Sequence, residues 1–168
     1  MIFDLNHEKL DSVFLPFRVH DACFYGDDIF LCSPDGVYLY KDNAIIDLKE
    51  TKPIFQYRVD DVDYNEARNE IYFATLGQGL IVYNKNNNST YTITEKDGLL
   101  GDIINEIHIE NHSEIWACTN SGLNKITFND TGGFNITGLK SSNGLLNDGI
   151  SDVEIVKNEV WIASKKRI

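Results

Sequence analysis

Ile71-Tyr72-Phe73-Ala74-Thr75 is one of four pentapeptides that decide the fold of this chain. Each copy has a β-branched residue, an aromatic residue, an apolar residue, a small residue and a hydroxyl residue, in that order. The other copies are Ile29-Phe30-Leu31-Cys32-Ser33, Ile115-Trp116-Ala117-Cys118-Thr119 and Val160-Trp161-Ile162-Ala163-Ser164. They recur with a period in the low forties, which is typical of the four-stranded blades of a β-propeller.

The residues around each pentapeptide repeat as well. Before each copy comes a segment with period-2 alternation, which predicts a strand, and a polar turn joins the two into a hairpin. These segments are residues 21–24, 61–64, 106–109 and 152–155. Two further strands follow each of the first three hairpins. No stretch has helical spacing of apolar residues over three turns, so we expect almost no helix.

A glycine follows each of the first three pentapeptides within a few residues. Gly36, Gly79 and Gly122 stand 43 residues apart. A tight turn that requires positive φ favours glycine, because a side chain with a Cβ adopts that conformation only at a cost. We therefore predict a structural role for these glycines.

The period divides the chain into consecutive units. The predicted fold class is all-β, with about three and a half to four blades of four-stranded antiparallel meanders that form an incomplete propeller. The expected divisions are 1–18 (end of a preceding blade), 19–58, 59–103 and 104–149 (three blades) and 150–168 (first half of a fourth). Because so few blades cannot close a large ring, the expected partner is the rest of a longer chain, with a second copy as the alternative.

The most specific stretch occurs twice. Residues 97–107 read DGLLGDIINEI and precede EIWACTNSGLNK at 114–125, and residues 143–153 read NGLLNDGISDV and precede EVWIAS at 159–164. This pattern resembles the two-component regulator propeller repeat. The sequence departs from that repeat at Phe30 and Tyr72, where the family prefers Trp, and at Arg167, where a glycine is expected.

The resemblance implies a role but no activity. In that family, such repeats build seven-bladed propellers in the extracytoplasmic half of bacterial hybrid sensor histidine kinases, many of which sense carbohydrates. The resemblance therefore implies a periplasmic sensor segment with an oligosaccharide as a candidate ligand. The histidine kinase module itself is absent from these 168 residues.

The charge argues against two kinds of partner. The formal net charge is −11, whereas contact with phosphate groups requires clustered Lys and Arg, so we expect no nucleic-acid ligand. The basic residues Lys165, Lys166 and Arg167 are interpreted as a solvated strand edge. No run of 18 apolar residues is present, so we expect no direct membrane insertion by this segment.

The three cysteines receive different predictions. Cys32 and Cys118 fill the small position of the pentapeptide, where we expect buried apolar residues, while Cys23 should point outward. A disulfide is the less favoured alternative. The acidic run that contains Asp61 and Asp63 lacks the glycine and glutamate of an EF-hand, and we interpret it as a solvated strand face.

The sequence offers no catalytic residue, cofactor site or metal site. His108 and His112 have a spacing that brings imidazoles together on a helix but not in a strand. Trp116 and Trp161 could stack on sugars, although packing between blades is the favoured interpretation. The candidate ligand-binding residues are placed by topology in loops at one end of the channel: Gln78 and Asn120 in turns, and Asp102 and Asp148 in connectors.

Three functional classes remain open. The leading hypothesis is a non-enzymatic sensor segment of a hybrid two-component system, which binds a ligand or relays its binding to a histidine kinase. The alternative is an interaction scaffold without a small-molecule ligand. A polysaccharide-acting propeller enzyme is the least favoured, because it would need paired carboxylates or a Tyr/His/Arg set at the channel mouth.

Overall fold

The computed structural model describes residues 2–3, 10–11, 13–129, 131–157 and 159–164. The described strands form three four-stranded and two two-stranded antiparallel sheets, and consecutive strands are neighbours in each sheet. The three complete sheets are β3 (Asp21–Tyr25), β4 (Asp28–Ser33), β5 (Gly36–Lys41) and β6 (Ala44–Asp47); β7 (Val59–Asn65), β8 (Glu70–Thr75), β9 (Leu80–Asn84) and β10 (Ser89–Ile93); and β11 (Ile104–Ile109), β12 (Glu114–Thr119), β13 (Gly122–Phe128) and β14 (Phe134–Leu139). The two-stranded sheets are β1 (Ile2–Phe3) with β2 (Leu10–Asp11), and β15 (Ile150–Val156) with β16 (Glu159–Ser164).

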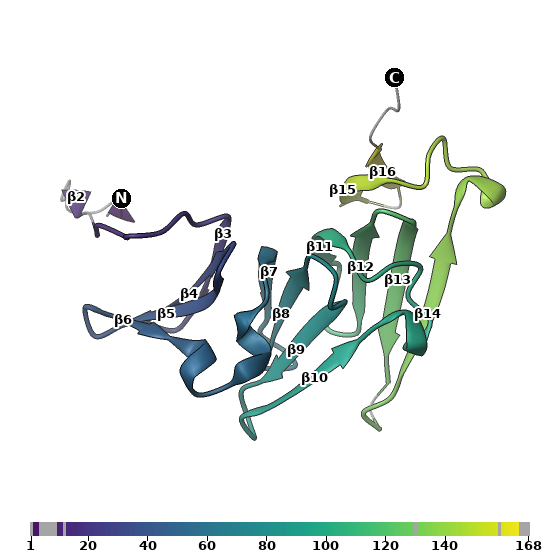
Figure 1. Cartoon of the computed structure of the whole chain (residues 1–168). Coiled ribbons are helices and arrows are strands. Elements are labelled where there is room, and N and C mark those ends of the chain that lie inside the picture. Colours follow the sequence, from purple (N-terminus) through teal and green to yellow (C-terminus); the bar gives the residue numbers. More distant parts are fainter. Residues whose placement is uncertain (1, 4–9, 12, 130, 158, 165–168) are drawn as a thin grey trace.

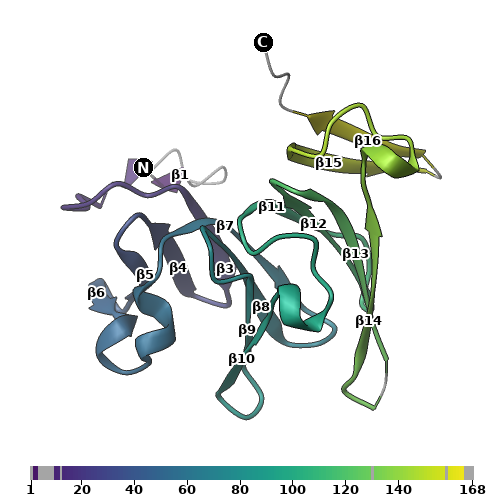
Figure 2. The same ribbon diagram turned by 45° about the vertical axis from the view of Figure 1, so that its right-hand side comes forward.

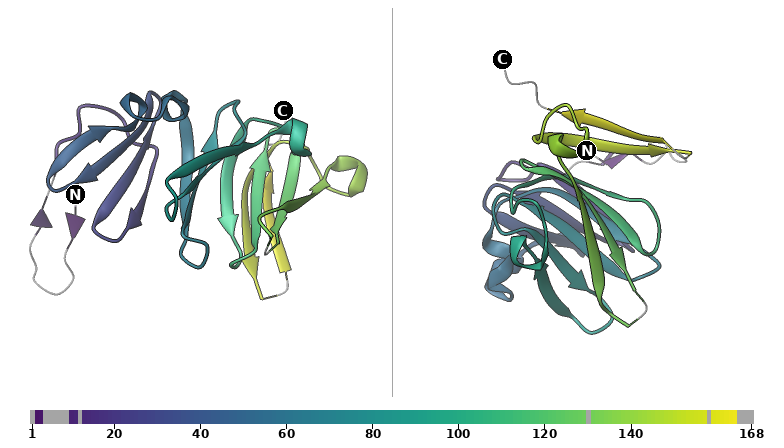
Figure 3. Two further views of the ribbon diagram at one scale, coloured as in Figure 1. Left: turned by 90° about the horizontal axis from the view of Figure 1, so that it is seen from below. Right: turned by 90° about the vertical axis from the view of Figure 1, so that its right-hand side faces the viewer.

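The sheets follow one another side by side, in chain order (Figure 1). The first strands of successive sheets, β3, β7, β11 and β15, pack against one another. The later strands of each complete sheet fan away from them, as Figure 2 and Figure 3 show from other sides. The described residues contain no α-helix; η1 (Leu48–Glu50), η2 (Pro53–Gln56), η3 (Glu95–Asp97) and η4 (Ser141–Asn143) are short 3-10 turns between sheets. The prediction of an all-β incomplete propeller is confirmed.

The hydrophobic core is divided among the interfaces between sheets. In β8, Tyr72 and Ala74 face the β11–β14 sheet, whereas Ile71 and Phe73 face the β3–β6 sheet. All four side chains are fully buried. A third cluster joins the β11–β14 sheet to the β15–β16 pair. This follows from the pentapeptide, because a strand that is covered on both faces needs apolar residues at every position.

The hydroxyl that ends each of the first three pentapeptides closes the next turn. Thr75 Oγ1 donates to the carbonyl oxygen of Gly79 at 2.6 Å and accepts from the backbone N–H of Gln78 at 2.9 Å. Ser33 and Thr119 donate in the same way to the carbonyl oxygens of Gly36 and Gly122. Since these groups are buried, each needs such a partner.

The glycines behave as the spacing predicts. Gly36, Gly79 and Gly122 have φ values of 120°, 71° and 145°. A Cβ on Gly79 would lie 2.2 Å from the carbonyl oxygen of Ile93. Glycine is therefore required here by conformation and also by the close approach of the end of the fourth strand.

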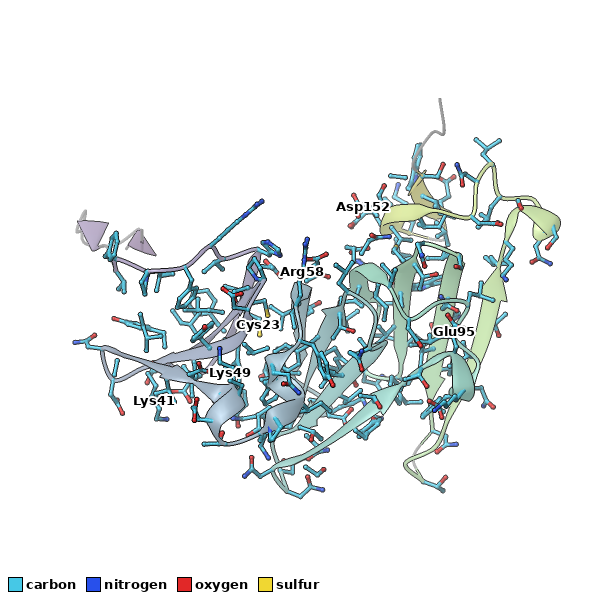
Figure 4. The ribbon with its side chains drawn as sticks, viewed as in Figure 1. Cys23, Lys41, Lys49, Arg58, Glu95 and Asp152 are labelled. Carbon is cyan, nitrogen blue, oxygen red and sulfur yellow. The ribbon has the colours of Figure 1, made fainter. Side chains whose placement is uncertain are left out.

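Cys23 corrects one prediction. Its side chain is buried with Val62 and Cys32 between the first two complete sheets instead of pointing outward (Figure 4). The reason is that an innermost strand has a neighbouring sheet on the side that Cys23 faces. Cys32 and Cys118 are fully buried, as predicted, and all three thiols are free.

Some predictions concern the ends of the chain. Of the segment predicted to end a preceding blade, residues 1, 4–9 and 12 lie outside the described residues, and residues 13–15 are not in a strand. Lys165, Lys166 and Arg167 lie outside them as well. Within the described part of the chain, no helix is long and apolar enough to span a bilayer.

Candidate functional site

The four residues predicted to bind a ligand lie in loops at one end of the sheets. This end, called the connector end, holds the connectors 48–58, 94–103 and 140–149 and the turns between second and third strands. The carbonyl oxygen of Asp102 accepts from the N–H groups of Gly77 and Gly79, each at 3.0 Å. The N–H of Asn120 donates to the carbonyl oxygen of Ile103 at 3.2 Å. The fold thus brings Gln78, Asp102 and Asn120 together, while Asp148 belongs to the following connector.

The two acidic side chains at the connector end have structural partners. Asp102 Oδ1 accepts from the N–H of Glu95 at 2.7 Å, and Asp148 Oδ1 accepts from that of Ser141 at 2.6 Å. Each therefore caps the 3-10 turn of its own connector. Gln78 lines a cavity of about 310 Å³ with residues of η2 and Tyr57. Ligand binding by these four residues stays a prediction.

A repeated carboxylate links the first strands of successive sheets. Asp21 Oδ2 accepts from the N–H of Val62 at 3.0 Å, and Asp61 Oδ2 accepts from that of Ile107 at 2.7 Å. Glu106 Oε2 continues the series by accepting from the N–H of Val153 at 3.2 Å; Figure 4 labels Asp152, which holds the equivalent place in β15. Sequence reasoning missed this role. The available signal was an acidic residue at the start of all four alternating segments.

The surroundings of these carboxylates correct the interpretation of a solvated face. Burial raises the pKa of Asp61, and the neighbouring Asp21, to which protonated Asp61 donates a hydrogen bond, raises it further. Burial also raises the pKa of Asp63 and of Glu106. Glu106 accepts from the Cys118 thiol at 3.2 Å. Burial therefore disfavours the charged forms of Asp61, Asp63 and Glu106.

We expect Asp61→Asn to reduce the loss of stability at alkaline pH. Because the pKa of Asp61 is raised in the folded state, its contribution is full below about pH 4 and is lost as the pH rises through the folded-state pKa. Asparagine keeps a carbonyl oxygen for the Ile107 N–H but cannot ionise. Between about pH 5 and about pH 9, the free energy of unfolding measured in urea should fall by on the order of 2 kcal/mol less in the variant than in the wild type.

The control is Asp27→Asn, which makes the same substitution at an exposed turn. Its unfolding free energy should depend on pH as the wild type does. If Asp61→Asn gave the wild-type pH dependence, the buried carboxyl would not be a source of it.

A second cavity lies between the first two complete sheets and is lined in part by the connector 48–58. Its volume is about 320 Å³, and its walls include the rings of Phe30, Phe55 and Tyr83 together with Lys52 and Lys85. The Lys85 ammonium lies 4.9 Å from the centroid of the Tyr83 ring and 5.1 Å from that of Phe30. Burial lowers the pKa of Lys85. Nothing in the repeat pattern singles out these two lysines, because they occupy a connector and a turn.

The two tryptophans have different environments. Trp116 is buried against the β15–β16 pair, which confirms the prediction of packing between blades. Trp161 holds the same place in β16 but is 63% exposed, because no further sheet covers β16 in the described part of the chain.

Comparison with solved structures identifies the fold. The extracellular domain assigned to the hybrid two component system BT3049 of B. thetaiotaomicron matches with a TM-score of 0.70 and 18% identity, over 96% of this chain and 22% of that chain. The extracellular domain of BT4673 from the same organism, described as a hybrid two component system, matches with a TM-score of 0.68 and 17% identity, over 96% and 23%. The chain has the fold of these extracellular domains.

The match covers only part of each solved domain. The chain spans less than a quarter of the length of either domain. The N-terminal domain of Nup159 also matches, with a TM-score of 0.58 and 13% identity, over 96% of this chain and 46% of that one. No family model and no curated protein matches the sequence. Function must therefore be argued from the chain itself as well as from the fold.

Proposed function

We propose that this chain is a non-enzymatic propeller segment in the extracytoplasmic sensor region of a hybrid two-component system. Its role is to bind a ligand, for which an oligosaccharide is the leading candidate, or to relay ligand binding to a histidine kinase. The observation that carries the proposal is the repeat of 97–107 at 143–153, placed in a fold that two extracellular domains of such systems share.

The packing of the sheets suits a relay. Each sheet buries its faces against its neighbours, and the Asp21, Asp61 and Glu106 carboxylates fix the register between successive first strands. Such an array moves as one stiff body. A ligand that favours one arrangement of two such arrays relative to each other would therefore shift the population of signalling states.

The partner that we propose is the rest of a propeller, supplied by a longer polypeptide. Among the described residues, the β15–β16 sheet has two strands, whereas each of the three complete sheets has four. Val160 and Trp161 on it are 42% and 63% exposed. Two added strands and a following sheet would cover these side chains. Completion by a second copy is the alternative source of the same strands.

The test of the proposed function is transcriptional. The gene is deleted in its own host, and transcripts of neighbouring genes are measured during growth on a panel of oligosaccharides. We expect induction by one glycan to disappear and to return on complementation with the full-length gene. In vitro, that glycan at 100 times its Kd should stabilise the full-length protein by about 2.7 kcal/mol, seen as a rise in Tm.

An unchanged transcript pattern in the deletion strain would contradict the sensing role. If, in addition, no glycan raised Tm, the interaction scaffold would become the better account. Turnover of a polysaccharide by the full-length protein, abolished by a single substitution, would instead favour an enzyme.

A further inference from the structure

The cavity between the first two complete sheets has an unusual distribution of charge. The chain has a net charge of −11, so an ammonium group would ordinarily meet a carboxylate. Among the described residues, however, neither Lys52 nor Lys85 has an ion pair within 4.0 Å. Asp28 contributes to the electrostatic environment of Lys85, but its carboxylate is held by Lys41 at 3.0 and 3.1 Å.

Both ammonium groups are held over the same aromatic wall. Lys52 Nζ lies 5.4 Å from the centroid of Tyr83 and donates to the carbonyl oxygen of Asn88 at 2.8 Å. Lys85 Nζ lies 4.9 Å from the same centroid and 4.5 Å from that of Tyr25. Burial lowers the pKa of Lys85, and the positive charge of Lys52 lowers it further. A bound anion would relieve both effects.

The lining and the volume of the cavity indicate what kind of ligand fits it. The apolar part of the lining comes from Phe30, Phe55, Tyr83, Leu39 and Leu48, and Thr51 and Asn88 line the cavity as well. A volume of about 320 Å³ lies at the lower end of the range for small-molecule pockets. It suits a single ring better than an extended chain.

We propose that the cavity between the β3–β6 and β7–β10 sheets binds a carboxylate carried on a six-membered ring. The ring lies against the apolar lining of the cavity, and the carboxylate accepts hydrogen bonds from Lys52 and Lys85. This inference deepens the proposed sensing function and rests on it for its biological role. Binding occupies a joint between two sheets, so it bears on how rigidly they are coupled.

The experiment is a calorimetric titration of the full-length protein with three compounds. D-galacturonate carries the carboxylate on a sugar ring, benzoate carries it on an aromatic ring, and D-galactose is the neutral match of the first. We expect at least one carboxylate to bind at least tenfold more tightly than galactose, and its affinity to fall as salt is raised. The ratio of the two carboxylate affinities distinguishes a sugar acid from an aromatic acid.

Substitutions of the two lysines test whether the carboxylate binds in this cavity. Lys85→Met should weaken carboxylate binding at least tenfold, because it removes a charge-assisted hydrogen bond. Lys96→Met removes an equal charge from an exposed position in η3 and should leave affinity within twofold. If Lys85→Met lowers Tm too far for titration, Lys52→Met carries the same test.

Two results would overturn the inference: no binding of either carboxylate at about 10 mM, or affinities of both carboxylates no higher than that of galactose. These outcomes are separate from a failure of the proposed function. If the protein bound a carboxylate but its deletion changed no transcript, the proposed binding site would stand and the proposed sensing function would be wrong. If induction were normal in a Lys85→Met strain, the sensing function would stand and this cavity would have no role in it.

Discussion

Gly79→Ala is expected to lower the free energy of unfolding by about 3 kcal/mol or more, a large share of the stability of a typical domain. The added Cβ would lie 2.2 Å from the carbonyl oxygen of Ile93, and φ at this position is +71°. The turn would have to move away from the end of β10. That movement breaks the bond from Thr75 Oγ1 to the Gly79 carbonyl. Urea denaturation followed by circular dichroism gives the change directly.

Gly77→Ala is the matched control for Gly79→Ala. Gly77 lies two residues away in the same turn with φ +109°, but a Cβ there would meet no atom within 4 Å. It carries the conformational cost without the clash, so we expect a loss of about 1 kcal/mol. Equal losses in the two variants would mean that the contact with Ile93 is unimportant.

Arg68→Met is the second substitution expected to have a large effect. Glu70 has a side chain that is 5% exposed, and its Oε2 accepts from Arg68 Nε at 2.8 Å and from the Tyr72 hydroxyl at 2.6 Å. Its Oε1 accepts from Asn84 Nδ2 at 3.0 Å. Methionine can still pack on Phe128, whose ring centroid lies 4.5 Å from the guanidinium carbon of Arg68, but it leaves the carboxylate without a cation. We expect a loss of about 3 kcal/mol in urea unfolding at neutral pH.

The double variant Arg68→Met/Glu70→Gln separates charge from packing. The neutral amide that replaces the Glu70 carboxylate would still bond with Asn84 and Tyr72 and would need no cation. We therefore expect the double variant to recover at least half of the loss. If it were as unstable as Arg68→Met, lost packing on Phe128 and not an unpaired charge would be the cause.

The strands could be predicted from the sequence because their signals are local and repeated. The alternation in 61–64 and the apolar run of Ile71-Tyr72-Phe73-Ala74-Thr75 predict β7 and β8, and the glycine that follows within a few residues predicts the turn before β9. The burial of Cys23 and Asp61 could not be predicted in the same way. It depends on which face of an innermost strand is covered by the next sheet, and alternation alone does not contain that information.

The candidate site was predicted only in part. Topology correctly placed Gln78, Asp102 and Asn120 at one end of the sheets. It could not reveal that Asp102 caps η3, because that bond depends on the exact path of the connector. Lys52 and Lys85 are brought to one cavity by the packing of two sheets, and their sequence separation carries no sign of it.

The carboxylate bonds between first strands all run in one direction, from each sheet to its successor. The two ends of the row from β3 to β16 therefore differ. The last sheet carries Asp152 at the acceptor position of this series. At the other end, no acid of this series among the described residues bonds to β3. Two copies joined through these ends would meet head to tail, in a heterologous contact without a two-fold axis. An assembly built this way grows by rotation and stops when the ring closes.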